Sequence, residues 1–305
     1  MTVIGCVQAD VVVSPVTDLP APGASALIDR ASVRVGGAGA NSALALVEAG
    51  LSVRLVGCVG DDPLGGLMRE ELAPWGLGGE LAILAGEPTG LTLALESSRR
   101  DRTFLTYLGV NSHWTPAMIP ADALRCESLL LCDYFVAPGM QGAAAHGLLD
   151  AARLGGARTF FDTAWDPDGF REAARASVLD LLPAVDVFLP NEAEACALAE
   201  LDPDAAPWAA RRLQRLSGGW VVVKLGARGA LAVGPDGIEL EVRAPEVHAV
   251  DTTGAGDAFN AGLIAALASG AAWQPALERA AAFASGVVAR PSGARYRPPA
   301  SASVG

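Results

Sequence analysis

Residues 250–260 read Val-Asp-Thr-Thr-Gly-Ala-Gly-Asp-Ala-Phe-Asn, and the interpretation of the whole chain starts from this stretch. Phe259, Leu263 and Leu267 recur at every fourth position, which predicts a helix that begins at the glycines. The first turn of a helix has backbone N–H groups without partners, and glycines let an anion approach them closely. The stretch therefore predicts an anion-binding helix N-terminus.

Asp257 falls in the first turn of this helix, beside the amides of Gly254, Ala255 and Gly256. A carboxylate beside an anion site suggests phosphoryl transfer, in which amides hold the developing charge and the carboxylate takes a hydroxyl proton. The alternative is that Asp257 is an ordinary acidic residue at a helix N-terminus and that the glycines only make a turn.

The complete stretch resembles the signature of the ribokinase-like, or PfkB, family of carbohydrate kinases. The resemblance implies that Asp257 is the catalytic base and that the amides of Gly254, Ala255 and Gly256 form an anion hole. It also implies ATP as the phosphoryl donor, Mg²⁺ as its companion ion, and a small sugar or sugar-like molecule as the acceptor.

A second glycine-rich stretch lies near the N-terminus, where residues 36–41 read Gly-Gly-Ala-Gly-Ala-Asn and open a predicted helix that ends near Ala49. The block resembles the N-terminal signature of the same family. The resemblance implies that Gly36, Gly37 and Asn41 hold substrate hydroxyls together with Asp257. It assigns the same role to Asp10, which follows the first predicted strand.

Short apolar runs alternate with helical patterns through the second half of the chain, which predicts a parallel, doubly wound sheet flanked by helices. The runs are Ser128–Cys132, Thr159–Asp162, Val185–Leu189 and Trp220–Lys224. The helical patterns cover 141–153, 170–182, 192–200 and 205–216, with a further Ala-rich helix over 271–289.

Residues 11–34 and 87–111 are extended segments with turns and no helix between them, and they predict a small separate sheet. The predicted core then comprises residues 1–10, 35–86 and 112–305. The resemblance implies that the small sheet is a β lid over the substrate and that it mediates a homodimer. The alternative is an extension of the main sheet.

Two further motifs follow strands of the predicted sheet. Asn191 and Glu194 have the spacing of a capping box, and the resemblance implies instead that they face the phosphates, with Glu194 organising Mg²⁺ through water. Lys224, Gly226 and Gly229 predict a tight turn, and the resemblance implies contact with the nucleotide.

The resemblance also places Asp251 and Thr253 near a monovalent cation such as K⁺. Two features depart from ribokinases proper: Ala38 replaces a lysine, and Tyr134–Met140 contains no acidic residue. These departures weaken the prediction of ribose as the substrate, and fructose, 2-keto-3-deoxygluconate and related sugars are further candidates. The alternatives are a nucleoside substrate or a non-catalytic regulator that binds sugar or nucleotide.

The composition of the chain limits the classes of partner and the cellular location that we expect for the protein. The 305-residue chain has a net charge of −12, which disfavours a nucleic-acid partner because phosphate backbones are repelled. No apolar run is long and uncharged enough to predict a membrane span. The five cysteines are widely spaced, which predicts reduced thiols in a cytoplasmic protein.

Overall fold

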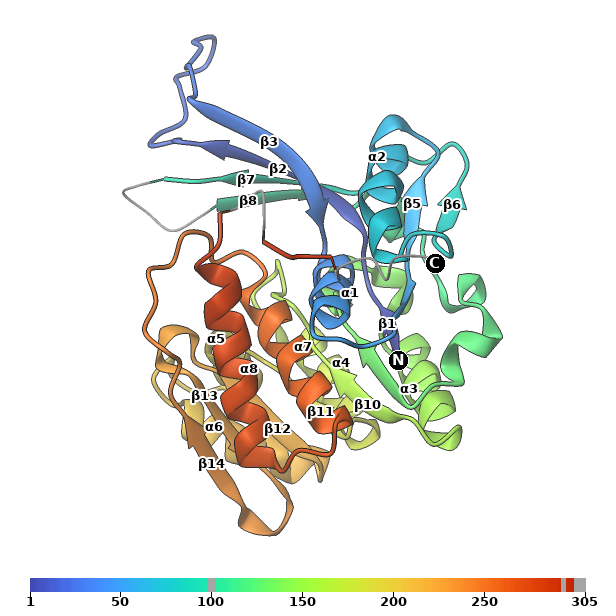
Figure 1. The fold of residues 1–305 in the computed structure, drawn as a ribbon, viewed down its shortest axis with the longest axis vertical. Helices are drawn as coiled ribbons and strands as arrows, with labels where there is room; N and C mark the ends of the chain where they lie inside the picture. The colour runs from blue at the N-terminus through green and yellow to red at the C-terminus, as the bar shows by residue number, and fades with distance from the viewer. Residues whose placement is uncertain (98–102, 292–294, 299–305) are drawn as a thin grey trace, which may run out of the picture.

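The computed structural model describes residues 1–97, 103–291 and 295–298, and its centre is one large sheet (Figure 1). The strand order is β14-β13-β12-β11-β10-β9-β1-β4. Six neighbouring strands are parallel: β4 (Arg54–Val56), β1 (Thr2–Ile4), β9 (Ser128–Leu131), β10 (Arg158–Phe161), β11 (Val187–Phe188) and β12 (Trp220–Lys224). The two antiparallel strands at one edge are β13 (Ala230–Val233) and β14 (Glu239–Val242).

Helices cover both faces of this sheet. One face carries α1 (Ala38–Glu48), α7 (Ala255–Ala268) and α8 (Trp273–Val288). The other carries α3 (Ala143–Leu154), α4 (Glu172–Leu181), α5 (Glu192–Leu198) and α6 (Ala206–Ser217). Short 3-10 helices connect these elements at Ala73–Trp75, Gly109–Ser112, Pro116–Met118, Ala121–Leu124, Tyr134–Val136, Pro138–Met140, Leu182–Ala184, Gly226–Arg228 and Pro235–Gly237.

The apolar strands explain the three layers, because successive side chains of a strand point to opposite faces. In β12, Val222 packs into the core beneath α1, α7 and α8, whereas Val221 and Val223 pack into the core beneath α3 to α6. All three side chains are fully buried. The prediction of a doubly wound, mostly parallel sheet flanked by helices is confirmed.

A separate sheet of four strands has the order β3-β2-β7-β8. Its strands are β2 (Gln8–Ser14), β3 (Arg30–Gly36), β7 (Leu91–Leu95) and β8 (Thr103–Tyr107). The prediction of a small separate sheet is confirmed. β2 begins three residues before the predicted boundary, so Asp10 belongs to the small sheet by its hydrogen bonding. Residues 98–101 of the predicted β7–β8 turn lie outside the described residues.

The small sheet lies across one end of the molecule, above the point where α7 begins (Figure 1). An ion pair joins the two parts, because Arg34 Nη1 of β3 donates to Asp251 Oδ2 at 2.8 Å. A third, two-stranded sheet of β5 (Cys58–Gly60) and β6 (Ala82–Leu84) packs beside α2 (Pro63–Leu72).

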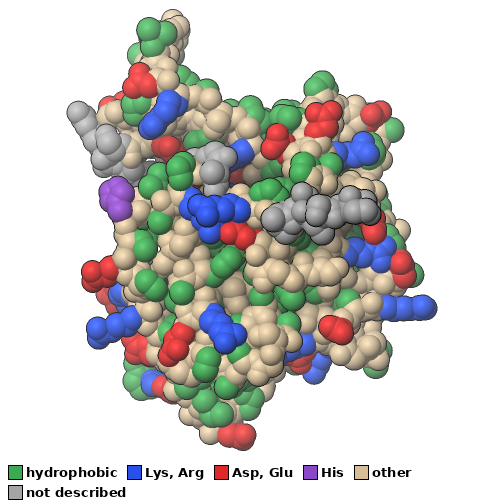
Figure 2. Space-filling model, viewed as in Figure 1, with side chains coloured by type: hydrophobic (Ala, Val, Ile, Leu, Met, Phe, Trp, Pro, Cys, Tyr) green, Lys and Arg blue, Asp and Glu red, His purple; other side chains and the backbone are tan. Residues whose placement is uncertain are grey.

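The surface seen in the same orientation has acidic and basic side chains interspersed among hydrophobic ones (Figure 2). Within the described residues, none of the helices combines the length and the apolar character that crossing a bilayer requires.

Candidate active site

The N-terminus of α7 is built as its sequence predicts. Gly254 is the N-cap residue and has φ +74°, a left-handed conformation that glycine adopts without strain. Ala255 and Gly256 begin the helix, and Asp257 stands in its first turn, half-buried. A Cβ placed on Gly256 would lie 3.4 Å from Lys224 Nζ, so Gly256 and this ammonium group are immediate neighbours.

Charged side chains near the carboxyl ends of the adjacent strands β10, β11 and β12 surround the N-terminus of α7. Lys224 Nζ, at the end of β12, donates to Asp162 Oδ2 at 2.5 Å, and Asp162 directly follows β10. Asn260 Nδ2, from α7, donates to the same oxygen at 2.6 Å. The carboxylates of Glu194 and Asp257 also interact electrostatically with Lys224. One ammonium group therefore lies among three carboxylates.

Burial and the proximity of the other carboxylates shift the pKa values of these groups. Burial raises the pKa of Asp257 to about 8, assisted by the negative charges of Asp162 and Asp133 and opposed by Lys224 and a hydrogen bond from Ser42. Burial likewise raises the pKa of Glu194 to about 7. Burial lowers the pKa of Lys224, but the neighbouring carboxylates outweigh it and raise that pKa overall. A carboxylate with a pKa near neutrality is suited to proton transfer.

The predicted substrate-binding residues meet at the start of α1. Asp10 of β2 is buried, and its carboxylate lies directly over Gly36, where a Cβ would be only 2.0 Å from Oδ1. Gly37 has φ +87° and lies against the Cys6 carbonyl, which leaves no room for a side chain. Asn41, in the first turn of α1, is buried.

The two helix N-termini, of α1 and α7, are joined by side chains. Ser42 Oγ donates to Asp257 Oδ1 at 3.3 Å, and α1 packs along α7. The structure therefore brings Asp257 to the helix α1, at whose start the predicted substrate-binding residues Gly36, Gly37 and Asn41 lie, and places Asp257 within electrostatic reach of Lys224.

Asp133, which follows β9, holds the start of α1 in place. Its carboxylate accepts N–H groups from Cys6 at 2.8 Å, Gly39 at 2.8 Å and Ala38 at 3.1 Å. Burial raises its pKa to about 6, opposed by these three hydrogen bonds. This acidic residue stands one position before Tyr134–Met140, the segment in which the sequence shows none, and it binds backbone groups.

We expect Asp133→Asn to lower the free energy of unfolding by about 1–3 kcal/mol, because one of the two acceptor oxygens becomes an NH₂ group facing buried N–H donors. Asparagine tolerates the left-handed conformation of this residue, φ +61°, so the backbone itself costs little. Urea unfolding of the variant and the parent measures the change. An unchanged unfolding midpoint would contradict the role assigned to Asp133.

Asn191 and Glu194 form a complete capping box at the start of α5. Glu194 N–H donates to Asn191 Oδ1 at 2.9 Å, and the Glu194 carboxylate accepts from Asn191 N at 2.8 Å and Asn191 Nδ2 at 2.6 Å. The interpretation of Asn191 and Glu194 as a capping box is therefore correct. It does not exclude a second role, because Glu194 also interacts electrostatically with Asp162 and Lys224.

A cavity of about 530 Å³ opens beside the start of α7, of a size that suits a nucleotide. Its lining includes the predicted nucleotide-binding residues Lys224, Gly226 and Gly229, together with Gly256. Asn191 and Glu194 do not line it. Its remaining walls come largely from apolar residues of α7, of α8 and of the segment between β14 and α7: Ala244, Pro245, Val247, Ala249, Ala255, Phe259, Ala281, Ala284 and Val288.

The donor set of the site suits a magnesium nucleotide. The three carboxyl groups of Asp162, Glu194 and Asp257 surround the single ammonium group of Lys224, so a divalent cation bound there would offset the negative charge that these groups carry when ionised. Carboxylate oxygens are ligands that Mg²⁺ prefers, and Mg²⁺ keeps several of its waters. Within the described residues, no group of three or more such side chains is arranged to hold a metal directly.

Asp251 and Thr253 do not form an open cation site. Asp251 Oδ1 accepts the Thr253 N–H at 2.9 Å, and its Oδ2 accepts from Arg34 at 2.8 Å and from Arg295 at 3.3 Å. Both carboxylate oxygens already have donors. The Asp251 side chain as placed therefore does not fit K⁺, contrary to the role that the resemblance implies.

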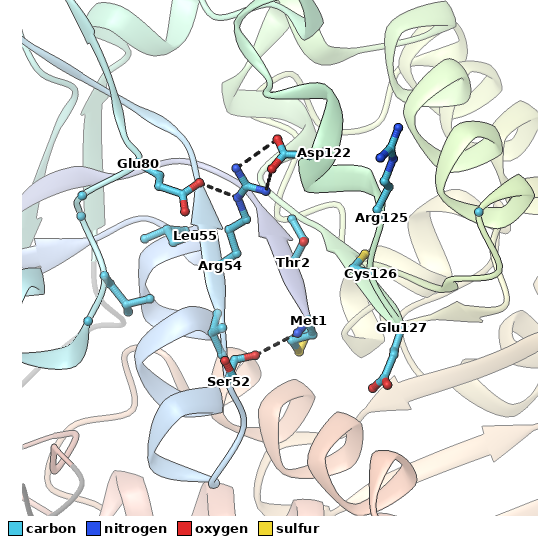
Figure 3. Close-up of a pocket in the computed structure, with 16 residues that line it drawn as sticks. Met1, Thr2, Ser52, Arg54, Leu55, Glu80, Asp122, Arg125, Cys126 and Glu127 are labelled. Carbon is cyan, nitrogen blue, oxygen red and sulfur yellow. Dashed lines mark hydrogen bonds and ion pairs between the residues drawn. The ribbon is translucent and has the colours of Figure 1, made fainter. Parts of the chain in front are cut away.

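A larger hollow of about 860 Å³ lies at the opposite edge of the main sheet (Figure 3). Met1, Thr2 and Arg54 line it at the amino ends of β1 and β4, whereas open parallel sheets bind ligands beyond the carboxyl ends of their strands. Arg54 is already paired with Glu80 at 2.5 Å and Asp122 at 3.0 Å. This hollow is therefore not the candidate active site.

Sequence reasoning missed several residues of the site. It assigned no role to Asp162, the last residue of the predicted run Thr159–Asp162, although an aspartate at the carboxyl end of a buried strand is itself a signal. It did not identify Asp133, Ser42 or Asn260. It also assigned no role to Arg34 or Arg295, because nothing in the neighbouring sequence indicates that either arginine pairs with a distant carboxylate.

Comparisons with known proteins agree with this geometry. A model of the pfkB family carbohydrate kinases matches residues 2–299. The ribokinase of Haemophilus influenzae is 28% identical over 276 residues, which cover 88% of this chain and 85% of that relative. The aminoimidazole riboside kinase of Salmonella typhimurium is 30% identical over 258 residues, 79% and 76% of the two chains.

Among solved structures, Arabidopsis thaliana ribokinase complexed with ribose and ATP matches with a TM-score of 0.80 at 25% identity, over 94% of this chain and 91% of that one. The predictions of a ribokinase-like fold and of an ATP-dependent carbohydrate kinase are confirmed. The chain belongs to the pfkB family of carbohydrate kinases.

Proposed function

We propose that this kinase transfers the γ-phosphoryl group of ATP to a hydroxymethyl group of a small sugar or sugar-like molecule. One observation carries the proposal: Asp257, with its raised pKa, stands in the first turn of α7 beside the amides of Gly254, Ala255 and Gly256, and Ala255 and Gly256 line the 530 Å³ cavity. This arrangement places a base and an anion hole around one reacting oxygen.

In this mechanism Asp257 accepts the proton of the attacking hydroxyl group, and the hydroxyl oxygen then bonds to the γ-phosphorus as the bond to ADP breaks. The amides of Gly254, Ala255 and Gly256 hold the charge on the transferring phosphoryl oxygens. Lys224 lies beside Gly256 and adds positive charge there. When bound with ATP, Mg²⁺ neutralises the phosphates, and Glu194 acts on it through water.

ATP occupies the 530 Å³ cavity in this proposal, with its base against the apolar walls from α7 and α8. Lys224, Gly226 and Gly229 contact the nucleotide at the cavity wall, and Asn191 lies at the phosphate end. The geometry of the β12–β13 turn supports this, because Lys224 and both glycines face the cavity.

Asp10, Gly36, Gly37 and Asn41 hold the acceptor through its hydroxyl groups. Their arrangement at the start of α1, next to Asp257, supports that role. Ribose is named in the Arabidopsis complex, and fructose and 2-keto-3-deoxygluconate are further candidates. A nucleoside is the second candidate class, because the Salmonella relative at 30% identity is a riboside kinase.

The test is ADP release with ATP, Mg²⁺ and K⁺ across pentoses, hexoses, keto-deoxy acids and nucleosides. We expect turnover on one class of compound and its loss in Asp257→Asn. Turnover on nucleosides alone would replace the sugar assignment. Binding of ATP without turnover on any compound would favour a non-catalytic regulator.

We propose a cytoplasmic location and no nucleic-acid or membrane partner. All five cysteines are free thiols, and four of them are buried, which suits a reducing compartment. The net charge of −12 disfavours phosphate backbones, and the face drawn in Figure 2 has acidic side chains among its basic ones.

We propose that the small sheet acts as the lid and forms a homodimer through β8. This edge strand exposes Phe104, Leu105 and Tyr107 to 53%, 55% and 55%. An exposed edge strand can pair with another chain, and an exposed apolar patch often marks an interaction surface. Phe104→Ser combined with Tyr107→Ser should give a monomer by light scattering, whereas Leu154→Ser, an exposed leucine on α3, should leave the dimer intact. A monomeric parent protein would contradict this proposal.

A further inference from the structure

Asp251, three residues before Gly254, has a carboxylate that accepts three hydrogen bonds. Its side chain is only 2% exposed, and both of its oxygens accept hydrogen bonds. Two of the donors are guanidinium groups, from Arg34 at 2.8 Å and from Arg295 at 3.3 Å. This is the position at which the resemblance implies a monovalent cation.

The two arginines reach Asp251 from distant parts of the chain. Arg34 belongs to β3 of the small sheet, and Arg295 belongs to the segment that follows α8. Their side chains are 16% and 6% exposed, so both charges are largely removed from water. Such burial is tolerated only where a charge is paired.

Arg295 also touches both helix N-termini of the site. Its Nη1 donates to Asn41 Oδ1 at 3.1 Å, at the start of α1. A Cβ placed on Gly254 would lie 3.3 Å from the same nitrogen, so the guanidinium group packs against the first residue of the anion hole. A fixed positive charge therefore stands beside Gly254, at the N-terminus of α7.

The charges around Asp251 are balanced without an ion. The two buried carboxylates, of Asp10 and Asp251, face the two guanidinium groups of Arg34 and Arg295, and both arginines act to lower the pKa of Asp10 against its burial. A potassium ion at Asp251 would add a charge within a few ångströms of both guanidinium groups, where repulsion is strong. It would also need oxygen ligands in directions that N–H donors occupy.

We propose that Arg34 and Arg295 replace the monovalent cation at Asp251 and position the anion-hole segment, so that this kinase does not require K⁺. The inference rests on the proposed kinase function. Arg34 and Arg295 are positioning residues, because they act through Asp251 and Gly254.

The first experiment uses the unaltered protein. Turnover on the acceptor found in the compound panel is measured in KCl and in choline chloride at equal ionic strength, together with the thermal unfolding midpoint in both salts. We expect the same turnover and the same midpoint in each. A rise in turnover of about tenfold or more with K⁺, or a higher midpoint in KCl alone, would overturn the proposal.

The second experiment tests whether Arg295 supplies the positive charge beside Asp251 that a cation would otherwise supply. Arg295→Met leaves the Asp251 carboxylate with a vacant direction, so we expect turnover to fall about tenfold or more in choline chloride and to recover with K⁺. Arg295→Lys keeps the charge and should stay independent of K⁺. Arg297→Met, an exposed arginine in the same segment, is the matched control and should behave as the parent.

Recovery by K⁺ separates this role from a purely structural one, because a merely unfolded variant would not regain turnover. If Arg295→Met loses activity equally in both salts while folded by circular dichroism, the replacement of the cation is refuted. If no compound is phosphorylated, the kinase function fails, and the two unfolding midpoints still decide whether K⁺ binds at Asp251.

Discussion

Asp257→Asn should lose at least about two decades of kcat, the scale on which removal of a general base acts. Asparagine keeps the size of the side chain and its place in the first turn of α7 but cannot accept the hydroxyl proton. ADP release on the acceptor found in the panel measures the loss. Asp62→Asn is the matched control, because Asp62 is also an acidic residue at a helix N-terminus, where it caps α2. It should keep its turnover.

The pH profile gives an independent check of the same residue. Only the ionised carboxylate acts as a base, and the pKa of Asp257 in the free protein is raised to about 8. The value of kcat/KM should therefore rise as the pH increases towards about 8, and this rise should be missing from the residual activity of Asp257→Asn. A variant with near-parent turnover would remove Asp257 from the mechanism.

The same pKa shift predicts a gain in stability from the inactivating substitution. The folded protein holds the Asp257 proton more tightly than the unfolded chain, whose aspartates titrate near 3.9. The stabilisation that comes from the protonated Asp257 is therefore fully present below about pH 3.9 and is lost as the pH rises through about 8. Asp257→Asn removes the ionisable group and with it this loss of stability at high pH. The substitution should therefore raise the free energy of unfolding at pH 9 by at least about 1 kcal/mol.

Lys224→Met should produce the largest loss of stability, about 3–5 kcal/mol, because it removes the ammonium group from among the buried carboxylates of Asp162 and Glu194 and the half-buried carboxylate of Asp257. Lys224 is the only lysine of the chain, and its Nζ lies 2.5 Å from Asp162 Oδ2. Methionine fills the space of the side chain without its charge. Guanidinium unfolding at pH 7.5 measures the effect.

Two comparisons separate charge from packing in Lys224→Met. Adding Asp162→Asn removes the carboxylate left without its partner and should restore most of the stability. Lowering the pH should shrink the loss, since Asp257 and Glu194, already raised to about 8 and about 7, then become protonated. Arg211→Met breaks the exposed pair with Glu239 and should cost at most about 1 kcal/mol. An equally small loss for Lys224→Met would refute the buried cluster.

Local pattern was enough to predict the main elements of the fold. Apolar runs such as Trp220–Lys224 are strands because both of their faces are buried, and the predicted helix start at Gly254 is observed. Each of these features depends on neighbours within a few residues in sequence. The same holds for the capping box of Asn191 and Glu194, whose groups are three residues apart.

The charges of the site could not be predicted in this way. Asp162 meets Asn260, 98 residues away, only because β10 ends beside the start of α7. Asp133 binds the amides of Ala38 and Gly39 only because β9 lies next to β1. These pairings depend on the strand order, which no local pattern specifies.

The sequence by itself determined the parallel sheet, the separate small sheet, the helix N-terminus with Asp257, and through its motifs the family of the protein. The tertiary structure alone decided how those groups are charged and paired. Arg34 and Arg295 reach Asp251 across 217 and 44 residues, from the small sheet and from the end of the chain. The physical reason is that electrostatic partners are chosen by distance in space and by burial, whereas sequence periodicity reports only which face of an element is buried.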